Sequence, residues 1–446
     1  MNEASKLKHV VIVGGGFAGL ACARELAKSH DVRVTLLDKN NFHQFQPLLY
    51  QLATAQLGSG DIATSLRRSL RGRANVDVKM DEVTAADPNT RTVTTKAGGS
   101  YTGDFLVLAA GSQANFFGTA GAEQNAFPLY SLNEAQRLRS RVLAVFEEAD
   151  RIPRLVEKGA LNFVTIGGGP TGTEIAGSLA DMINLTMTTE YTDLAVKAAR
   201  VYLIDHGHTL LSPFSPEAHE YAAKTLQQKG VQLRLGVLVK EVGPDHVLLS
   251  DGTSIQTHTA VWAWGLMAAP LAAHAGLPRG HGGRIEVQHD LTVEGFPGVY
   301  VLGDFANISG PDGHFLPQLG SVAQQSGEYA AKNILADIAG RPRAPFHYHD
   351  KGIMAMIGRN AAVAEIGGRR HELHGPIAFA AWLGVHALLM SGVRERIEAF
   401  ISWAWNYFHR SLAVQVLDRK DERKIDWGDD GESENASAPP DVKTAA

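Results

Sequence analysis

Two glycine-rich segments with the same spacing lie about 150 residues apart in this chain of 446 residues. Each has glycines at its first, third and sixth positions: Gly14, Gly16 and Gly19, then Gly167, Gly169 and Gly172. Each segment follows an apolar run that predicts a strand and precedes a run that predicts a helix. In a strand–turn–helix unit of this kind, backbone N–H groups at the helix N-terminus bind a pyrophosphate. We therefore expect two dinucleotide sites.

An acidic residue ends the next predicted strand of each unit. Asp38 follows Gly19 by 19 residues, and Asp205 closes the predicted strand 201–205. A carboxylate at this place hydrogen-bonds a ribose hydroxyl, and its charge repels a 2′-phosphate. Because no arginine or lysine occurs in the ten residues after Asp205, NADH is favoured over NADPH. Two dinucleotides in one chain indicate a hydride transfer between them.

Further candidates for cofactor binding lie beside the first loop and at the ends of later strands. They are Phe17, Ala18, Lys39, Ala110, Gly111, Gly303 and Asp304. The predicted strand 298–303 is apolar and ends on Asp304, and we expect it to return to the first unit. The second dinucleotide unit is then an insertion into the first.

Length and composition set the class of protein. A chain of this length with 44% hydrophobic residues and 46 glycines predicts an α/β protein of roughly two or three domains. The net charge of −5 gives no indication of nucleic-acid binding. No apolar run of about 20 residues predicts a spanning helix, and the short polar start predicts no signal peptide. No metal site is predicted.

The single cysteine, Cys22, lies in the helix after the first loop, where a small buried residue is expected. Flavoproteins with this loop arrangement often use a redox-active pair of cysteines. One cysteine excludes that chemistry and is consistent with a reducing compartment.

Residues 346–417 differ in composition from the two dinucleotide units. The stretch 376–390 is apolar but too short to span a bilayer, and 393–410 predicts an amphipathic helix. The apolar stripe of that helix comprises Ile397, Phe400, Ile401, Ala404 and Phe408. Three tryptophans between 382 and 405, flanked by arginines, are typical of a helix in a membrane interface. The alternative is a helix that packs on the body of the protein or on a second subunit.

Four stretches resemble the type II (single-subunit, non-proton-pumping) NADH:quinone oxidoreductases. They are 45–53, 168–174, 299–304, and 348–359 together with 382–405. The resemblance extends to about residue 416, although Ser326 stands where the family commonly has glycine. It implies FAD on the first loop, NADH on the second, and a quinone as the electron acceptor. It also implies C-terminal helices that dock peripherally on the cytoplasmic face of the cell membrane.

We therefore predict an α/β fold with two Rossmann-type dinucleotide-binding domains and a C-terminal amphipathic helical membrane-association region. The expected FAD-binding domain comprises 1–122 and 276–345, and the NADH-binding domain comprises 123–275. The membrane-associating region is 346–417, and 418–446 is predicted to be a disordered tail. A homodimer is consistent with this organisation.

Glu174 is the leading candidate for a catalytic residue. It lies two residues after Gly172, in the expected first turn of a helix, where an acid stabilises the helix by its charge. The resemblance instead implies a carboxylate near the nicotinamide and flavin that assists proton delivery to the quinone. Gln324 and Gln325 are candidates to hydrogen-bond a quinone or the flavin, and the alternative is a helix face in solvent.

Three further residues are candidates for the quinone site: Gln46, Tyr50 and His386. Gln46 and Tyr50 are placed to line the quinone entrance. His386 lies on an apolar helix face, where a core histidine is the usual outcome and a proton donor to the quinone is the alternative. Two other functions remain open from the sequence: a soluble NADH-dependent flavoprotein reductase that serves a protein acceptor, and an NADH-sensing flavin-binding regulatory protein.

Overall fold

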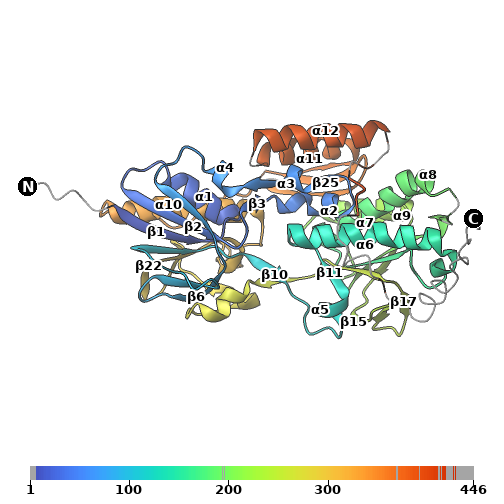
Figure 1. The fold of residues 1–446 in the computed structure, drawn as a ribbon, viewed down its shortest axis with the longest axis horizontal. Helices are drawn as coiled ribbons and strands as arrows, with labels where there is room; N and C mark the ends of the chain where they lie inside the picture. Colours follow the sequence, from blue (N-terminus) through green and yellow to red (C-terminus); the bar gives the residue numbers. More distant parts are fainter. Residues whose placement is uncertain are drawn as a thin grey trace, which may run out of the picture.

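The structure is a computed structural model that describes residues 7–192, 194, 196–367, 370–390, 392–409, 412, 414–417, 425 and 427. Figure 1 shows two α/β units side by side, with the N-terminus at the far end of the first unit. Helices α11 (Gly375–Leu389) and α12 (Val393–His409) lie along one edge of the molecule. The α/β class and the pair of dinucleotide-type units agree with the predicted fold class.

Six strands form the first sheet, in the order β21-β22-β9-β1-β2-β5. Only β21 pairs antiparallel to its neighbour. β22 comes after the whole second unit in the chain, yet it pairs with β9. The chain therefore leaves the first sheet and returns to it. The bounds are β1 (Lys8–Val13), β2 (Val32–Asp38), β5 (Val76–Met80), β9 (Phe105–Leu108), β21 (Thr292–Val293) and β22 (Phe296–Val301).

The second sheet has five parallel strands in the order β11-β18-β12-β13-β14, in which β18-β12-β13-β14 correspond to β9-β1-β2-β5 of the first sheet. Its central strand β12 holds the place of β1, and each of the two precedes a glycine loop. The bounds are β11 (Ala126–Pro128), β12 (Asn162–Ile166), β13 (Arg200–Asp205), β14 (Val231–Leu235) and β18 (Thr259–Trp262). The long helices of this unit are α6 (Leu132–Arg151), α7 (Pro170–Met182) and α9 (Pro216–Gln228), and α5 (Ala122–Asn125) and α8 (Thr188–Glu190) are short.

Each unit also carries a three-stranded antiparallel sheet beside its parallel one. These are β6 (Val83–Asp87), β7 (Thr92–Thr95) and β8 (Ser100–Thr102), and then β15 (Val239–Val242), β16 (His246–Leu249) and β17 (Ser254–Gln256). The antiparallel pair β10 (Ser112–Ala114) and β19 (Leu266–Ala268) joins the two units. The segment between β2 and β5 forms β3 (Phe42–Gln44), α2 (Leu49–Ala53), α3 (Ser59–Ile62), β4 (Ala63–Ser65) and α4 (Leu66–Ser69).

Helix α1 (Phe17–Leu26) follows the first loop and packs closely on α10 (Gly320–Ile338). A Cβ at Gly327 of α10 would lie 2.1 Å from the Ala18 carbonyl oxygen, so only glycine permits this approach. Cys22 is fully buried in the same contact and is a free thiol, as expected from its small size. The close packing brings α10 to the edge of the first glycine loop.

The C-terminal region begins with the antiparallel strands β24 (Gly352–Gly358), β25 (Ala361–Ile366) and β26 (His371–His374), followed by α11 and α12. Within the described residues, no helix is both long enough and apolar enough to span a bilayer. Trp382 and Trp403 are buried, and Trp403 donates its Nε1–H to Gln51 Oε1 at 2.6 Å. Two of the three tryptophans attributed to a membrane interface are therefore core residues, and only Trp405 is exposed.

The predicted disordered tail falls outside the described residues except at Ile425 and Trp427. Trp427 is buried, contacts His258 with ring centroids 4.4 Å apart and ring planes tilted by 56°, and donates its Nε1–H to Glu148 at 2.8 Å. At this position the expectation of disorder is wrong, because an indole ring finds both an aromatic neighbour and an acceptor on the second unit.

Candidate functional site

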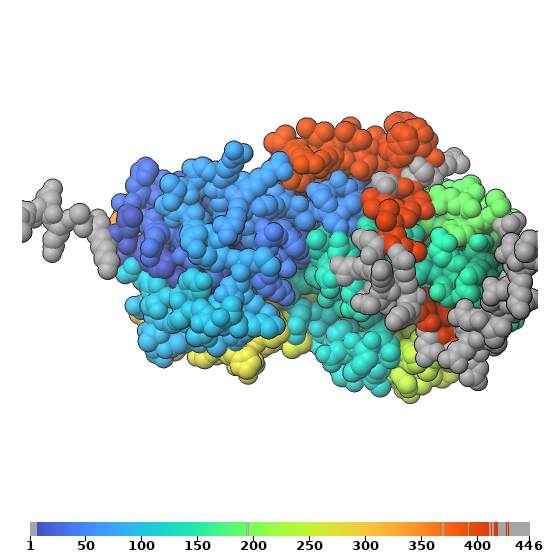
Figure 2. All heavy atoms as spheres, viewed as in Figure 1, coloured from blue at the N-terminus to red at the C-terminus, as the bar shows by residue number. Residues whose placement is uncertain are grey.

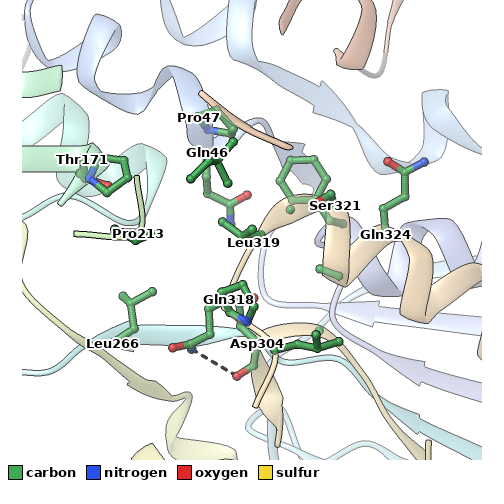
Figure 3. Close-up of a pocket in the computed structure, with 18 of the residues that line it drawn as sticks. Gln46, Pro47, Thr171, Pro213, Leu266, Asp304, Gln318, Leu319, Ser321 and Gln324 are labelled. Carbon is green, nitrogen blue, oxygen red and sulfur yellow. Dashed lines mark hydrogen bonds between the residues drawn. The ribbon is translucent and has the colours of Figure 1, made fainter. Parts of the chain in front are cut away.

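A cavity of about 1060 Å³ lies between the two units and the C-terminal region. Its walls come from both glycine-loop helices, from α10, and from β24 and α11. Figure 3 shows Thr171 and Pro213 on one side of it and Ser321 and Gln324 on the opposite side. Predicted site residues that line this cavity are Gly16, Phe17, Ala18, Gln46, Tyr50, Gly111, Glu174, Gly303, Asp304, Gln324, Gln325 and His386.

The other predicted site residues do not line this cavity: Gly14, Gly19, Asp38, Lys39, Ala110, Gly167, Gly169, Gly172 and Asp205. A second pocket, with a volume of only about 10 Å³, has Gly167, Asp205, His206 and Trp264 in its lining. It lies at the end of β13, where the second unit carries its acid. The second glycine loop is thus bordered by a pocket on each side.

The three glycines of the first loop have separate steric roles. Gly14 has φ +100°, and Gly19 lies so close to it that a Cβ on Gly19 would be 1.8 Å from the Gly14 carbonyl oxygen. A Cβ on Gly16, in contrast, would meet no atom within 4 Å. The outer glycines close the turn, and the middle one faces open space at the N-terminus of α1. This is the cradle that a pyrophosphate needs.

The second loop has the same geometry. Gly167 has φ +112°, a Cβ on Gly172 would lie 1.7 Å from the Gly167 carbonyl oxygen, and Gly169 faces open space. Pro170 begins α7 directly after Gly169, where its missing N–H costs no hydrogen bond. The residues therefore fit a second dinucleotide as well as the first loop fits one.

Asp38 and Asp205 each tie a glycine loop to the end of a neighbouring strand. Asp38 Oδ2 accepts from Gly15 N–H at 2.6 Å, and Asp205 Oδ2 accepts from Gly168 N–H at 2.5 Å. The second oxygen of each accepts from the backbone just beyond its strand, at 2.6 Å in both units. Burial nevertheless raises the pKa of Asp38, with its hydrogen bonds acting in the opposite direction.

Asp304 belongs to a hydrogen-bonded triad that the sequence did not reveal. Its Oδ2 accepts from Tyr130 Oη at 2.8 Å and from Ser112 Oγ at 3.1 Å. Burial raises the pKa of Asp304, and these two donors partly offset that effect. Ser112 directly follows the predicted site residues Ala110 and Gly111, so its position in the sequence was a signal for it. Tyr130 lies in a turn with no recognisable motif. Figure 3 also shows Gln318 donating to the Asp304 carbonyl, at 3.4 Å.

Glu174 is a buried acid in the wall of the cavity. Burial raises its pKa to about 8, although its Oε1 accepts from Met356 N–H at 3.2 Å. The first turn of α7 contains no acidic residue, so the expected first-turn position is wrong. One turn further along, Glu174 lies beyond the reach of the helix N-terminus, and desolvation dominates. At neutral pH its side chain is mostly the protonated acid.

Gln325 is held by the chain itself. Its amide donates to the His349 carbonyl at 3.0 Å and accepts from His349 N–H at 2.9 Å, which fixes the segment before β24 against α10. Gln324 donates to Glu328 at 2.9 Å. Ser326, at the position where the family pattern has glycine, accepts from Gly303 N–H at 3.1 Å and so positions the turn before Asp304.

Gln46 and Tyr50 differ in what they offer the cavity. Gln46 Oε1 is buried and has no hydrogen-bond partner among the described residues, so it is an acceptor available to a ligand. Tyr50 is buried rather than placed at an entrance, and its hydroxyl contacts Gln51 Nε2 at 3.0 Å and Met356 Sδ at 3.1 Å. The predicted entrance role of Tyr50 does not fit this environment.

His386 lies on α11 with one edge toward the cavity. Its ring stacks on Trp382 at 3.8 Å, and Nδ1 lies 2.8 Å from the Trp382 carbonyl oxygen, to which it donates as Nδ1–H. Burial lowers its pKa to about 4. The neutral ring then presents Nε2 as an acceptor, so a proton donor at this position does not fit the structure.

The outer faces of α11 and α12 carry large exposed apolar side chains. The predicted stripe faces outward on α12, with exposed fractions of 56% for Ile397, 65% for Phe400 and 77% for Phe408. On α11, Val385 and Leu389 are exposed and also line the cavity. Figure 2 shows the two helices as a ridge along one edge of the molecule. The cavity therefore opens at the apolar ridge.

The chain is similar to known flavin- and nucleotide-dependent oxidoreductases. A family model described as pyridine nucleotide-disulphide oxidoreductase matches residues 8–327. The chain is 36% identical to the type II NADH:quinone oxidoreductase NdhA of Mycobacterium tuberculosis, over 92% of this chain and 89% of that protein. It is 28% identical to the type II NADH:quinone oxidoreductase of Staphylococcus saprophyticus, over 82% and 91% respectively.

A solved structure, NDH2 from Plasmodium falciparum in complex with NADH, matches with a TM-score of 0.84. It covers 91% of this chain and 99% of that one at 19% identity, and so supports the fold. The chain is an oxidoreductase with two dinucleotide units. It belongs to the type II NADH:quinone oxidoreductase family, which confirms the resemblance found in the sequence.

Proposed function

We propose that this protein is an FAD-dependent NADH:quinone oxidoreductase that transfers two electrons from NADH to a membrane quinone without pumping protons. One observation carries the proposal: a single cavity is bordered by both glycine-loop helices and opens at the apolar face of α11. Such a cavity lets a nucleotide, a flavin and an apolar acceptor meet in one place.

The first loop suits FAD. Gly16 leaves open space for the pyrophosphate. In this proposal Asp38 holds the adenosine ribose, and Asp304, in the cavity wall, holds the ribityl chain. The unpartnered Gln46 Oε1 is an acceptor for a ligand N–H. When bound, FAD supplies a two-electron carrier that NADH reduces and a quinone reoxidises.

The second loop suits NADH, with Gly169 toward the pyrophosphate and Asp205 toward the ribose. Trp264 and His206 line the small pocket beside Asp205, where their ring centroids lie 5.1 Å apart. The charge of Asp205 disfavours a 2′-phosphate. The chain therefore selects NADH over NADPH through this carboxylate.

At neutral pH the Glu174 carboxyl holds a proton, and its side chain lies in the part of the cavity wall that α7 forms. Reduction of a quinone to a quinol takes up two protons, and Glu174 is the protonated acid in the cavity wall that can supply one. His386, as a neutral acceptor, orients a donor group of the ligand instead. Gln325 positions the segment before β24, and Gln324 faces the cavity from α10.

The protein associates peripherally with the cytoplasmic face of the cell membrane in this proposal. The exposed apolar side chains of α11 and α12 enter the interface, and the quinone reaches the cavity past Val385 and Leu389. We favour the membrane over a second copy of the chain as the main occupant of this face, because the cavity opens there and an apolar acceptor must enter.

The test is a spectrum of the purified protein in mild detergent. Flavin bands near ~450 nm should bleach on addition of NADH and recover with a short-chain quinone over many turnovers. Bleaching without recovery would point to a protein acceptor, a single turnover would point to an NADH sensor, and absence of flavin would refute the proposal.

A further inference from the structure

Four arginines lie close together on the surface of the first dinucleotide unit, outside the C-terminal region. They are Arg67, Arg68, Arg71 and Arg73, and all four are exposed. The neighbouring Leu66 and Leu70 are buried, and Leu70 N–H donates to the Leu66 carbonyl at 3.1 Å. Because the side chains of the two leucines are buried in the protein, the arginines between and after them point toward the solvent. We call these four residues the arginine cluster.

The arginine cluster adjoins the N-terminal end of α12. Arg68 Nη1 lies 3.2 Å from Oε1 of the buried Glu395, across 327 residues of sequence. Exposed apolar residues flank this ion pair on α12, with Val393 at 70% and Ile397 at 56% exposure. Figure 1 shows α4 beside α12 on the same edge of the molecule. The cluster and the apolar ridge therefore form one continuous surface.

The charges of the cluster are largely uncompensated. Arg68 is paired with Glu395, and Arg394 of α12 is paired with Glu398 at 2.5 Å. Within the described part of the chain, no acidic group lies within ion-pair distance of Arg67, Arg71 or Arg73. The whole chain has a net charge of −5, so this cationic surface runs against the overall sign. An apolar ridge edged by free guanidinium groups complements an anionic lipid surface.

We propose that the arginine cluster binds the phosphate headgroups of anionic phospholipids, as a second membrane contact that acts together with α11 and α12. The inference rests on the proposed docking of the apolar ridge. If only the apolar ridge contacted the membrane, the protein could still rotate about the axis of α12. Headgroup contacts at α4 remove that freedom and hold the cavity mouth at Val385 and Leu389 against the bilayer.

The experiment compares the FAD-loaded protein with the triple variant R67Q/R71Q/R73Q. Binding is measured by co-sedimentation with vesicles of phosphatidylcholine, and with vesicles of phosphatidylcholine mixed with phosphatidylglycerol. A basic residue near an anionic surface contributes about fivefold to partitioning, so three should contribute on the order of 100-fold on the mixed vesicles. Binding to neutral vesicles should change little, and the difference should shrink in high salt.

The matched control is K96Q/K224Q/K240Q, which removes the same charge from exposed positions on elements other than α4 and α12. It should bind both kinds of vesicle as the native protein does. Equal losses in the two triple variants would show a net-charge effect and overturn the site. Undiminished binding of R67Q/R71Q/R73Q to anionic vesicles would do the same, as would an equal loss on neutral vesicles.

Turnover with NADH and a short-chain quinone, without vesicles, separates this inference from the proposed function. R67Q/R71Q/R73Q should match the native rate, because the cluster lies outside the cavity. A native protein that turns over but binds neither vesicle would overturn the membrane contact and leave the enzyme activity standing.

Discussion

The buried acid Glu174 gives the sharpest test of the proposed chemistry. Its pKa of about 8 against an ordinary 4.5 corresponds to about 5 kcal/mol of preference for the neutral form. With a pKa of about 8, roughly nine-tenths of the Glu174 carboxyls are protonated at pH 7 and roughly one-tenth at pH 9. If this proton is delivered to the quinone, kcat should fall about tenfold between those two pH values.

Glu174→Gln keeps the shape and the neutral charge of the protonated acid but has no proton to transfer. We expect normal flavin content and normal bleaching by NADH, with kcat for a short-chain quinone lowered on the order of 100-fold at pH 7. The variant should also lose the fall in kcat toward pH 9. Glu157→Gln, at an exposed position, is the control and should keep both rate and pH profile.

The assay is steady-state NADH oxidation at saturating NADH and quinone from pH 6 to pH 9, with infrared difference spectra of the protonated carboxyl. The carboxyl band should disappear near pH 8 in the native protein and be missing in Glu174→Gln. A native rate that is flat to pH 9, or a variant that retains the native profile, would refute the role of Glu174 as the acid.

Three further outcomes follow from the packing. Gly19→Ala should lose FAD, whereas Gly172→Ala should keep the flavin bands and no longer bleach with NADH, because the added Cβ atoms would lie 1.8 and 1.7 Å from carbonyl oxygens. Absorbance spectra check both, and FAD retained in Gly19→Ala would contradict the first loop assignment. Phe400→Ser with Phe408→Ser should lower binding to vesicles at least about 100-fold at unchanged turnover with soluble quinone; sedimentation at native strength would argue against the apolar ridge. Trp427→Ala should lower the melting temperature by a few degrees, since it removes a buried ring and its bond to Glu148; an unchanged melting temperature would mean that this contact contributes nothing.

The two dinucleotide units were accessible from the sequence because their requirements are local. A glycine must stand at positions 19 and 172, where any Cβ would collide with the carbonyl of the same loop. The acids at positions 38 and 205 accept backbone N–H groups of the loops they follow. Such short-range steric and hydrogen-bond demands leave a fixed spacing in the sequence. The amphipathic period of α12 is readable for the same reason.

Side-chain environments were less predictable, even where the element was right. Composition grouped Trp382, Trp403 and Trp405 as interface residues, yet the fold buries the first two. Tyr50 was expected at an entrance, and its hydroxyl is instead taken up by Gln51 and Met356. Periodicity shows that a helix has an apolar face, but it does not show whether that face meets the protein or the solvent.

The sequence by itself determined the two nucleotide loops, their acids, the family and the presence of an apolar stripe on α12. Only the tertiary structure decided that Glu174 is a protonated acid, because burial in the folded protein raises its pKa to about 8 despite the hydrogen bond from Met356 N–H, 182 residues away. Only the tertiary structure placed the arginine cluster beside α12, through a contact across 327 residues. Local motifs reflect steric and hydrogen-bond requirements between residues close in the sequence. The burial, protonation and pairing of side chains depend on segments that meet only after the chain has folded.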